Sequence, residues 1–246
     1  MHTHDPAVDQ MQRMIGEWQS FLDSAIHDLR APLRGIGTSA ELLVEACGQS
    51  LNSEVRRLIS AILDGVAQIE ALSKSLAIYS RALQADKPPC ESIRLESAVR
   101  AALAELEGEI RQRGAVVKYG PLPRVRGNHE QLTALFRALL SNALLYQGSE
   151  PPSIHITAQR EQDQWRFAVR DNGIGIEPKY FHQIFQPFQR LRAGPAGVGL
   201  GLTICQKIVE AHGGTIWVES QLQAGSTFCF ILPAAPDMTA QVAEGV

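Results

Sequence analysis

A histidine and an aspartate, His27 and Asp28, stand side by side in a stretch whose apolar residues recur in steps of three and four. This spacing predicts one helix of a packed bundle, with His27 beside the apolar seam and not on it. The adjacent carboxylate can hold one ring nitrogen protonated, so that the other nitrogen presents its lone pair for attack. Pro32 removes one backbone hydrogen bond and bends the helix nearby, at a cost of roughly 3 kcal/mol. These residues suit a nucleophilic histidine, but an ordinary surface histidine would look the same in this helix alone.

Two polar side chains further along can contact a nucleotide. Asn142 lies on a predicted helix, Gly127 to Tyr146, on the side away from its apolar positions. Its amide oxygen can ligate Mg²⁺ between phosphates, although a solvated asparagine is the alternative there. Asp171 directly follows a predicted strand, Trp165 to Val169, and its carboxylate can accept a hydrogen bond from an adenine amino group.

Glycines accompany these polar residues. Gly173 and Gly175, in the sequence DNGIGI, permit a close backbone approach to a ligand. A hairpin turn is the alternative for Asp-Asn-Gly, but the residues that follow do not have the pattern of a returning strand. Gly197, Gly199 and Gly201 open another predicted helix, whose exposed N–H groups and positive dipole end suit a phosphate.

Two long predicted helices precede these polar residues and glycines. The seam of the first comprises Leu22, Ile26, Leu29, Leu33, Ile36, Ala40, Leu43 and Cys47. After a polar break at residues 48–53, the seam of the second comprises Val55, Leu58, Ile62, Gly65, Ile69, Leu72, Leu76, Tyr79 and Leu83. Such a pair packs antiparallel, and dimerisation into a four-helix bundle would cover the apolar surface that remains. A coiled-coil spacer is the alternative. Pro88 and Pro89 end the helical pattern and predict a domain boundary.

The rest of the chain alternates helices and strands. We expect a helix from Leu95 to Arg113 and strands at Val116–Tyr119, Ile154–Ala158, Thr215–Val218 and Ser226–Leu232, besides the elements named above. This order predicts a sheet covered by helices.

The composition restricts the classes of function. With 246 residues, 45% of them hydrophobic and 20% charged, the chain should fold as one large or two modest domains. A net charge of −3 provides no basic field for nucleic acid. The four cysteines are isolated, which argues against a zinc site or a disulfide framework and favours a reducing cytoplasm. We expect no signal peptide and no membrane span, and therefore a sensory input from an unknown partner.

Five sequence stretches together resemble a known family. The run H-D-L-R-A-P-L from His27 closely resembles the phosphoacceptor box of bacterial sensor histidine kinases. The stretches at Asn142, at DNGIGI, at Tyr180–Leu191 and at GVGLGL follow the order of the N, G1, F and G2 boxes of the histidine kinase ATP-binding domain. That fold is shared with gyrase, heat-shock chaperones and mismatch-repair ATPases. The likeness covers about Phe21 to Leu232, and its C-terminal run looks most like phytochrome-type kinases.

The resemblance implies a fold, cofactors and roles for residues. The fold is α+β: a helical hairpin that forms a dimeric four-helix bundle (residues 1–86), an α/β-sandwich ATP-binding domain (90–235) and a C-terminal tail (236–246). ATP and Mg²⁺ are the implied cofactors. Asn142 would bind Mg²⁺, Asp171 the adenine, Arg190 the phosphates, and Thr227 the base side. Gly173 and Gly175 would form the hinge of a lid, and Gly197, Gly199 and Gly201 would cradle the phosphates.

Three positions depart from the family pattern. Ala138 replaces a usual asparagine or histidine, and Leu145 replaces a usual lysine or arginine, which weakens the expected metal or phosphate contacts. Ala138 also argues against a gyrase-like ATPase, because a glutamate activates water at that position. Ala31 stands where many relatives carry the threonine or asparagine that positions a water for dephosphorylation, so we expect little phosphatase activity.

These observations predict a cytoplasmic, homodimeric histidine kinase. His27 and Asp28 would be its catalytic residues, and a response regulator would receive the phosphate on an aspartate. One alternative is a degenerate, kinase-like docking module that binds ATP weakly or not at all. Another is a serine kinase of the anti-sigma or mitochondrial type, which would not need the sequence around His27.

Overall fold

The computed structural model describes residue 24 and residues 28–29, 31–47, 52–84, 91–191 and 199–235. These residues fall into two compact units. The first comprises the helical residues up to Gln84 together with residues 199–200, and the second comprises residues 91–191 and 201–235. Among the described residues, no helix is both long enough and apolar enough to cross a bilayer.

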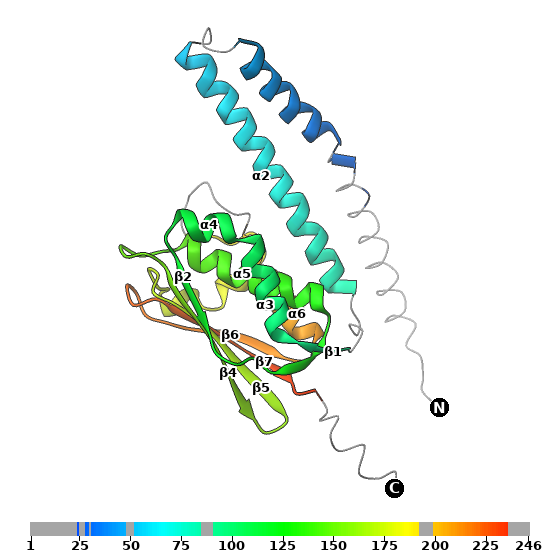
Figure 1. Ribbon diagram of the computed structural model, residues 1–246, viewed down its shortest axis with the longest axis vertical. Helices are drawn as coiled ribbons and strands as arrows, with labels where there is room; N and C mark the ends of the chain where they lie inside the picture. Colours follow the sequence, from blue (N-terminus) through cyan, green and yellow to red (C-terminus); the bar gives the residue numbers. More distant parts are fainter. Residues whose placement is uncertain are drawn as a thin grey trace. The chain divides into compact units, whose positions relative to one another are not determined.

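The helical unit is a hairpin of two helices (Figure 1). The first helix is described over residues 31–47, and α2 extends over Ser53–Gln84. The side chain of Asn52 accepts a hydrogen bond from the backbone N–H of Val55 at 2.8 Å, which caps the start of α2. The polar break predicted at residues 48–53 therefore ends in a helix cap, as expected.

The predicted apolar seam of the first helix divides into two faces. Leu33 and Ala40 are buried, and a Cβ atom on Gly37 would lie 3.6 Å from Val66 on α2, so this face packs within the hairpin. The other face is exposed in the single chain, and we call it the open stripe. It carries Leu29, Ile36 and Leu43 on the first helix and Val55, Leu58, Ile62 and Ile69 on α2, each 37–55% exposed.

The second unit has helices on one face of a five-stranded sheet (Figure 1). The strand order is β2-β4-β5-β7-β6, with β2 parallel to β4 and every other pair antiparallel. These strands are β2 (Val116–Tyr119), β4 (Ser153–Glu161), β5 (Gln164–Asp171), β6 (Thr215–Ser220) and β7 (Ser226–Pro233). The helices are α3 (Leu95–Glu105), α4 (Glu107–Gln112), α5 (His129–Leu145) and α6 (Gly201–Ala211).

The core lies between α5 and the middle of the sheet. Asn128 caps α5 by accepting a hydrogen bond from the N–H of Gln131 at 3.0 Å. Phe136 of α5 meets Phe230 of β7 edge to face, with ring centroids 5.9 Å apart, and Phe230 stacks on Phe167 of β5 at 5.0 Å. This aromatic layer fixes the helix against the two strands whose ends form the candidate site.

Two local predictions differ from the structure. The helix expected from Leu95 to Arg113 is broken at Leu106, where φ is −101° and ψ is 6°, into α3 and α4. A two-stranded sheet of β1 (Glu91–Arg94) and β3 (Arg124–Gly127) was not predicted, because both strands have only four residues. Gly127 therefore ends β3 and does not begin α5. A Cβ atom at this glycine would overlap the imidazole ring of His212.

Candidate functional site

Asp171 ends β5 as a buried carboxylate, with 8% of the residue exposed. Its Oδ1 atom accepts hydrogen bonds from the backbone N–H groups of Gly173 at 2.8 Å and of Ser226 at 3.1 Å. Burial raises the pKa of Asp171, and these two hydrogen bonds oppose that rise. Both donors go to one oxygen, so within the described ranges the other oxygen, Oδ2, is the acceptor available for a ligand.

The glycines after Asp171 are required by the packing of the loop. A Cβ atom on Gly173 would overlap the carbonyl oxygen of Tyr146 and the Oδ1 atom of Asp171. Gly175 has φ of +70°, and a Cβ atom there would overlap the carbonyl oxygen of Gln221. Only glycine fits such positions without moving the backbone. The predicted close approach at these glycines is thus to other parts of the protein. This packing fixes residues 172–176, which we call the glycine loop, beside Asp171.

The turn between β6 and β7 holds this loop from the other side. The N–H of Gln223 donates to the carbonyl of Ile174 at 2.7 Å, and the N–H of Ile176 donates to the hydroxyl of Ser220 at 2.8 Å. Gly225 has φ of +88°, and a Cβ atom there would overlap the carbonyl oxygen of Asp171. The two turns therefore interlock through one close glycine from each.

Asn142 lies in the last turns of α5, next to the same loop. Its carbonyl accepts the N–H of Tyr146 at 3.0 Å, and the carbonyl of Tyr146 accepts the N–H of Ile174 at 3.1 Å. Asn142 is half-buried. One turn earlier, the Cβ of Ala138 lies 4.0 Å from a Cβ built on Gly201, so this side of α5 is directed to the start of α6 and not to open solvent.

The start of α6 has the features that an anion site needs. Gly201 begins the helix, and Gly199 just before it has φ of +77°. Thr203, in the first turn, is 3% exposed, and its hydroxyl has no hydrogen-bond partner within the described part of the chain. Free backbone N–H groups and an unpaired hydroxyl at a helix N-terminus suit a phosphate oxygen. Gly197, the first predicted glycine of this box, lies outside the described residues.

The segment after the glycine loop contains two short 3₁₀ helices, η2 (Pro178–Tyr180) and η3 (Gln183–Phe185). Phe188 has φ of +62° and is 59% exposed, which is unusual for a large apolar residue. The exposed Arg190 follows it on the same segment. The predicted catalytic pair is only partly described, because Asp28 is an exposed helical residue and His27 lies outside the described residues.

The geometry does not support the predicted role of Thr227. The cross-strand neighbours of Thr227 are Arg170 and Glu219, both exposed, whereas the aromatic Phe228 and its alternate neighbours point to the helices. Successive side chains of a strand point to opposite faces. Thr227 therefore lies on the side of the sheet away from Asp171. The residue on the same side as Asp171 is Ser226, which is 6% exposed and bonds to that carboxylate through its N–H.

Two further residues of the site were missed. Ser220 bonds to the glycine loop and lies directly opposite Ser226 in the β6–β7 register. Asn172 accepts a hydrogen bond from the N–H of Ser153 at 2.7 Å and donates one to the carbonyl of Pro151 at 3.0 Å, which ties the start of β4 to the end of β5. The alternation of Phe228, Phe230 and Leu232 was the available signal for Ser226, because it assigns the even-numbered positions of β7 to the covered face.

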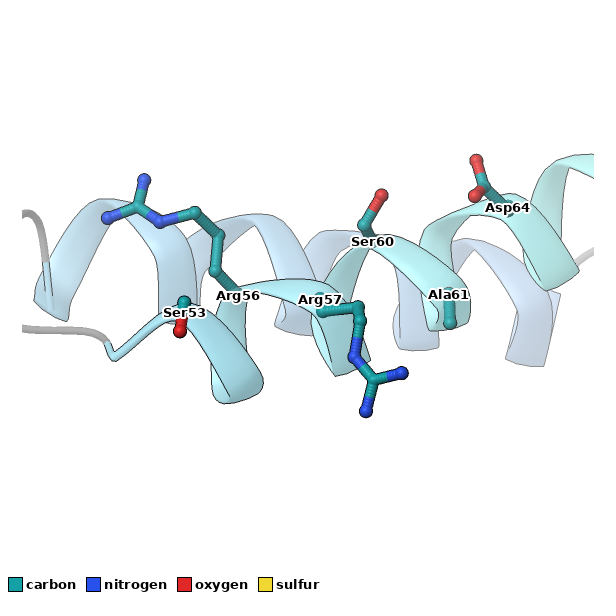
Figure 2. A pocket seen from close by; sticks show the side chains of 6 residues that line it. All are labelled: Ser53, Arg56, Arg57, Ser60, Ala61 and Asp64. Atoms are coloured by element: carbon teal, nitrogen blue, oxygen red, sulfur yellow. The ribbon is translucent and has the colours of Figure 1, made fainter.

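A shallow depression lies on α2, in the helical unit (Figure 2). All six residues that line it come from this one helix, so the depression has a single wall. The lining comprises Ser53, Arg56, Arg57, Ser60, Ala61 and Asp64. It contains none of the predicted site residues, and we assign it no ligand.

Residues 127–236 match the family of histidine kinase-, DNA gyrase B- and HSP90-like ATPases. The chain is also 38% identical over 225 residues to cyanobacterial phytochrome A of Nostoc sp. strain PCC 7120, a match that covers 91% of this chain and 29% of that protein. This chain is a relative of the sensor histidine kinases. The resemblance predicted from the five sequence stretches, including the likeness to phytochromes, is confirmed.

Other histidine kinases agree with this relationship. The methanogenesis regulatory histidine kinase FilI of Methanothrix harundinacea is 31% identical over 228 residues, covering 92% of this chain and 26% of that protein. The solved structure of the histidine kinase ThkA in complex with the response regulator TrrA has the same fold, with a TM-score of 0.60, 23% identity, and coverage of 93% of this chain and 66% of that one. The chain spans less than a third of the length of the two curated relatives. The α+β ATP-binding domain expected from the sequence is the one observed.

Proposed function

We propose that this chain is an ATP-dependent protein histidine kinase that phosphorylates its own His27 and passes the phosphate to an aspartate of a response regulator. The observation that supports this most strongly is the buried Asp171, whose Oδ1 is held by two backbone N–H groups. A carboxylate so fixed has one oxygen left for a ligand donor, which suits the amino group of adenine. Burying this charge costs stability, and in a domain without a ligand nothing would offset that cost.

In the proposed reaction, one nitrogen of the His27 imidazole attacks the γ-phosphorus of ATP. The bond from that phosphorus to the bridging oxygen breaks, and its electron pair leaves on ADP. Asp28 accepts the proton from the other ring nitrogen, so that the phosphorylated ring is neutral. Backbone N–H groups at the start of α6 and the guanidinium of Arg190 would stabilise the charge on the phosphoryl oxygens.

Asn142 would hold the metal ion. A side-chain amide is a hard oxygen donor of the kind that Mg²⁺ prefers, and the described residues contain no group of three or more acidic, histidine or cysteine side chains that would favour another metal site. Bound Mg²⁺ supplies positive charge to the phosphates during transfer. With a single protein ligand, the ion would be held mainly by the nucleotide.

The open stripe supports a homodimer. Its seven apolar residues recur every three, four or seven positions along two antiparallel helices, and each is more than a third exposed in the single chain. Full burial of such side chains stabilises an interface by roughly 1.5–3 kcal/mol each before the cost of association is subtracted. A second copy that presents the same stripe would bury both and form a four-helix bundle.

The alternative is a kinase-like docking module with weak or no ATP binding, which Ala138 and Leu145 favour. Ala138 places a methyl group, and not a polar side chain, beside the start of α6. We give more weight to the buried Asp171 carboxylate and to the unpaired hydroxyl of Thr203 at the start of α6, because the two can pair with an adenine donor and a phosphate oxygen.

One experiment separates these functions. Purified wild-type protein and the His27→Gln variant are incubated with Mg²⁺ and ATP labelled on the γ-phosphate, and the protein-bound label is tested for stability in acid and base. The kinase predicts an acid-labile, base-stable label that is absent from the variant. Absence of label in the wild type, with nucleotide binding also absent, would favour the docking module.

A further inference from the structure

The hydroxyl of Ser220 is the centre of a hydrogen-bond network beside Asp171. It donates to the carbonyl of Gly225 at 2.8 Å and accepts the N–H of Ile176 at 2.8 Å. The hydroxyl of Ser226 lies 2.9 Å from it. A serine hydroxyl has one proton and two lone pairs. With its proton given to Gly225 and one lone pair to Ile176, Ser220 has one lone pair left to accept the proton of Ser226, and in this arrangement every one of these contacts is a hydrogen bond.

This count determines the polarity of the Ser226 hydroxyl. Its single proton is committed to Ser220, so Ser226 Oγ can accept a hydrogen bond but has no proton to donate. Ser226 is on the covered face of the sheet, and its own N–H donates to Oδ1 of Asp171 at 3.1 Å. Asp171 and Ser226 are therefore neighbouring residues on this face, and in this arrangement the carboxylate and the Ser226 hydroxyl oxygen both present only lone pairs.

We propose that Ser220 is a specificity-determining residue of the nucleotide site: by holding the proton of Ser226, it makes the site a pair of acceptors that selects a purine with an amino group at C6. The inference rests on the proposed ATP-binding function. Adenine offers two N–H donors at C6, one for Asp171 Oδ2 and one for Ser226 Oγ. A 6-oxo purine places an acceptor oxygen there, opposite two acceptors, and leaves all three unpaired. Ser220 does not touch the base and acts by positioning the proton of Ser226.

The test compares ATP with inosine triphosphate, which has an oxygen at C6 in place of the amino group. The Kd of each is measured by competition with a fluorescent ATP analogue at a fixed Mg²⁺ concentration, and the ratio of the two Kd values is the readout. In Ser220→Ala, the hydroxyl of Ser226 is released and can rotate to donate to the C6 oxygen. We expect the preference for ATP to fall roughly 3- to 10-fold, the range of one neutral hydrogen bond.

Three further variants control the test. Ser220→Thr keeps the hydroxyl and should keep the wild-type ratio. Ser226→Ala removes the acceptor itself and should lower the ratio even if Ser220→Ala does not fold. Ser97→Ala removes an exposed hydroxyl that bonds to the carbonyl of Arg94 on another element, and it should change neither Kd. Thermal unfolding of each variant reports the structural effect separately.

The outcomes are distinguishable. Equal changes of both Kd values in Ser220→Ala and Ser226→Ala, with an unchanged ratio, would mean that the network only supports the fold, and the inference would be overturned. A wild-type protein that binds neither nucleotide would refute the proposed function itself.

Discussion

Asp171→Asn should separate stability from nucleotide binding in this domain. Asparagine keeps the shape of the side chain and an oxygen that can accept from the N–H groups of Gly173 and Ser226. It replaces the other carboxylate oxygen by an NH₂ group. The opposite orientation would point the NH₂ group at two backbone N–H groups, so the asparagine is held with its amide nitrogen toward the ligand.

The effect on binding follows from this orientation. The variant loses one hydrogen bond between a charged acceptor and the adenine amino group, worth about 1.5–3 kcal/mol. That energy corresponds to a loss of roughly 10- to 150-fold in affinity for ATP. The NH₂ group facing another NH₂ group adds to this loss, so the lower value is a minimum.

The effect on stability has the opposite sign. Burial raises the pKa of Asp171 above 3.8, so the folded state holds this proton more tightly than the unfolded state does. The stabilising contribution of this carboxyl to the free energy of unfolding is fully present below pH 3.8, and it is lost as the pH rises through the pKa of the folded state. At neutral pH, the buried charge therefore reduces the stability of the nucleotide-free protein. The neutral asparagine removes this cost, and the variant should unfold at the same temperature as the wild type or at a higher one.

The assay combines thermal unfolding without nucleotide and titration with a fluorescent ATP analogue. Asp163→Asn is the matched control, because Asp163 is exposed in the β4–β5 turn of the same domain and should affect neither measurement. A variant at position 171 that binds ATP within threefold of the wild type would refute the assignment of the adenine carboxylate. Unfolding several degrees lower would show that the ionised carboxylate supports the fold, contrary to this reasoning.

Three further predictions follow from backbone and histidine geometry. Gln162 has φ of +55° in the β4–β5 turn, so Gln162→Gly should raise the free energy of unfolding in urea by about 0.5–1 kcal/mol, and a decrease would contradict the assigned strain. Gly175→Ala should lower the free energy of unfolding by at least ~2 kcal/mol and weaken ATP binding, because the added Cβ would overlap the backbone of Gln221. Gly108→Ala is its control and should be neutral or stabilising, because the space around Gly108 is open. Burial lowers the pKa of His212 below 6.5, and its Nε2 accepts a backbone N–H, so protonation is disfavoured in the folded state. Stability should therefore decrease as the pH falls below about 6.5, and urea unfolding at pH 7.5 and 5.5 should show a smaller difference for His212→Gln than for the wild type.

Local patterns in the sequence predicted most of the fold. The apolar positions of α5 and the alternation in β5 and β7 identified elements that the structure contains, with ends moved by at most two residues. Asp171 and its two glycines were found because strand end, carboxylate and glycines are adjacent in the chain. Thr227 was chosen by its place in a motif, whereas the alternation at Phe228 and Phe230 already indicated Ser226.

The remainder of the site depends on the pairing of distant segments. Ser220 matters because the β6–β7 register places it opposite Ser226, and because the glycine loop at Ile176 reaches its hydroxyl. No periodicity within one helix or strand contains that information. The division of the first helix into a packed face and the open stripe likewise depends on which side α2 covers, which the seam alone did not reveal.

The contact between Asp171 and Ser226 joins positions 55 residues apart. Closing such a long loop costs conformational entropy before the stabilising contact is made. This corner of the sheet should therefore assemble late during folding. A fragment that stops before β7 would lack a donor to Asp171 and with it half of the proposed adenine site, however well its earlier helices formed. ATP should consequently protect the whole domain against proteolysis and amide exchange, because only the completed sheet can hold it.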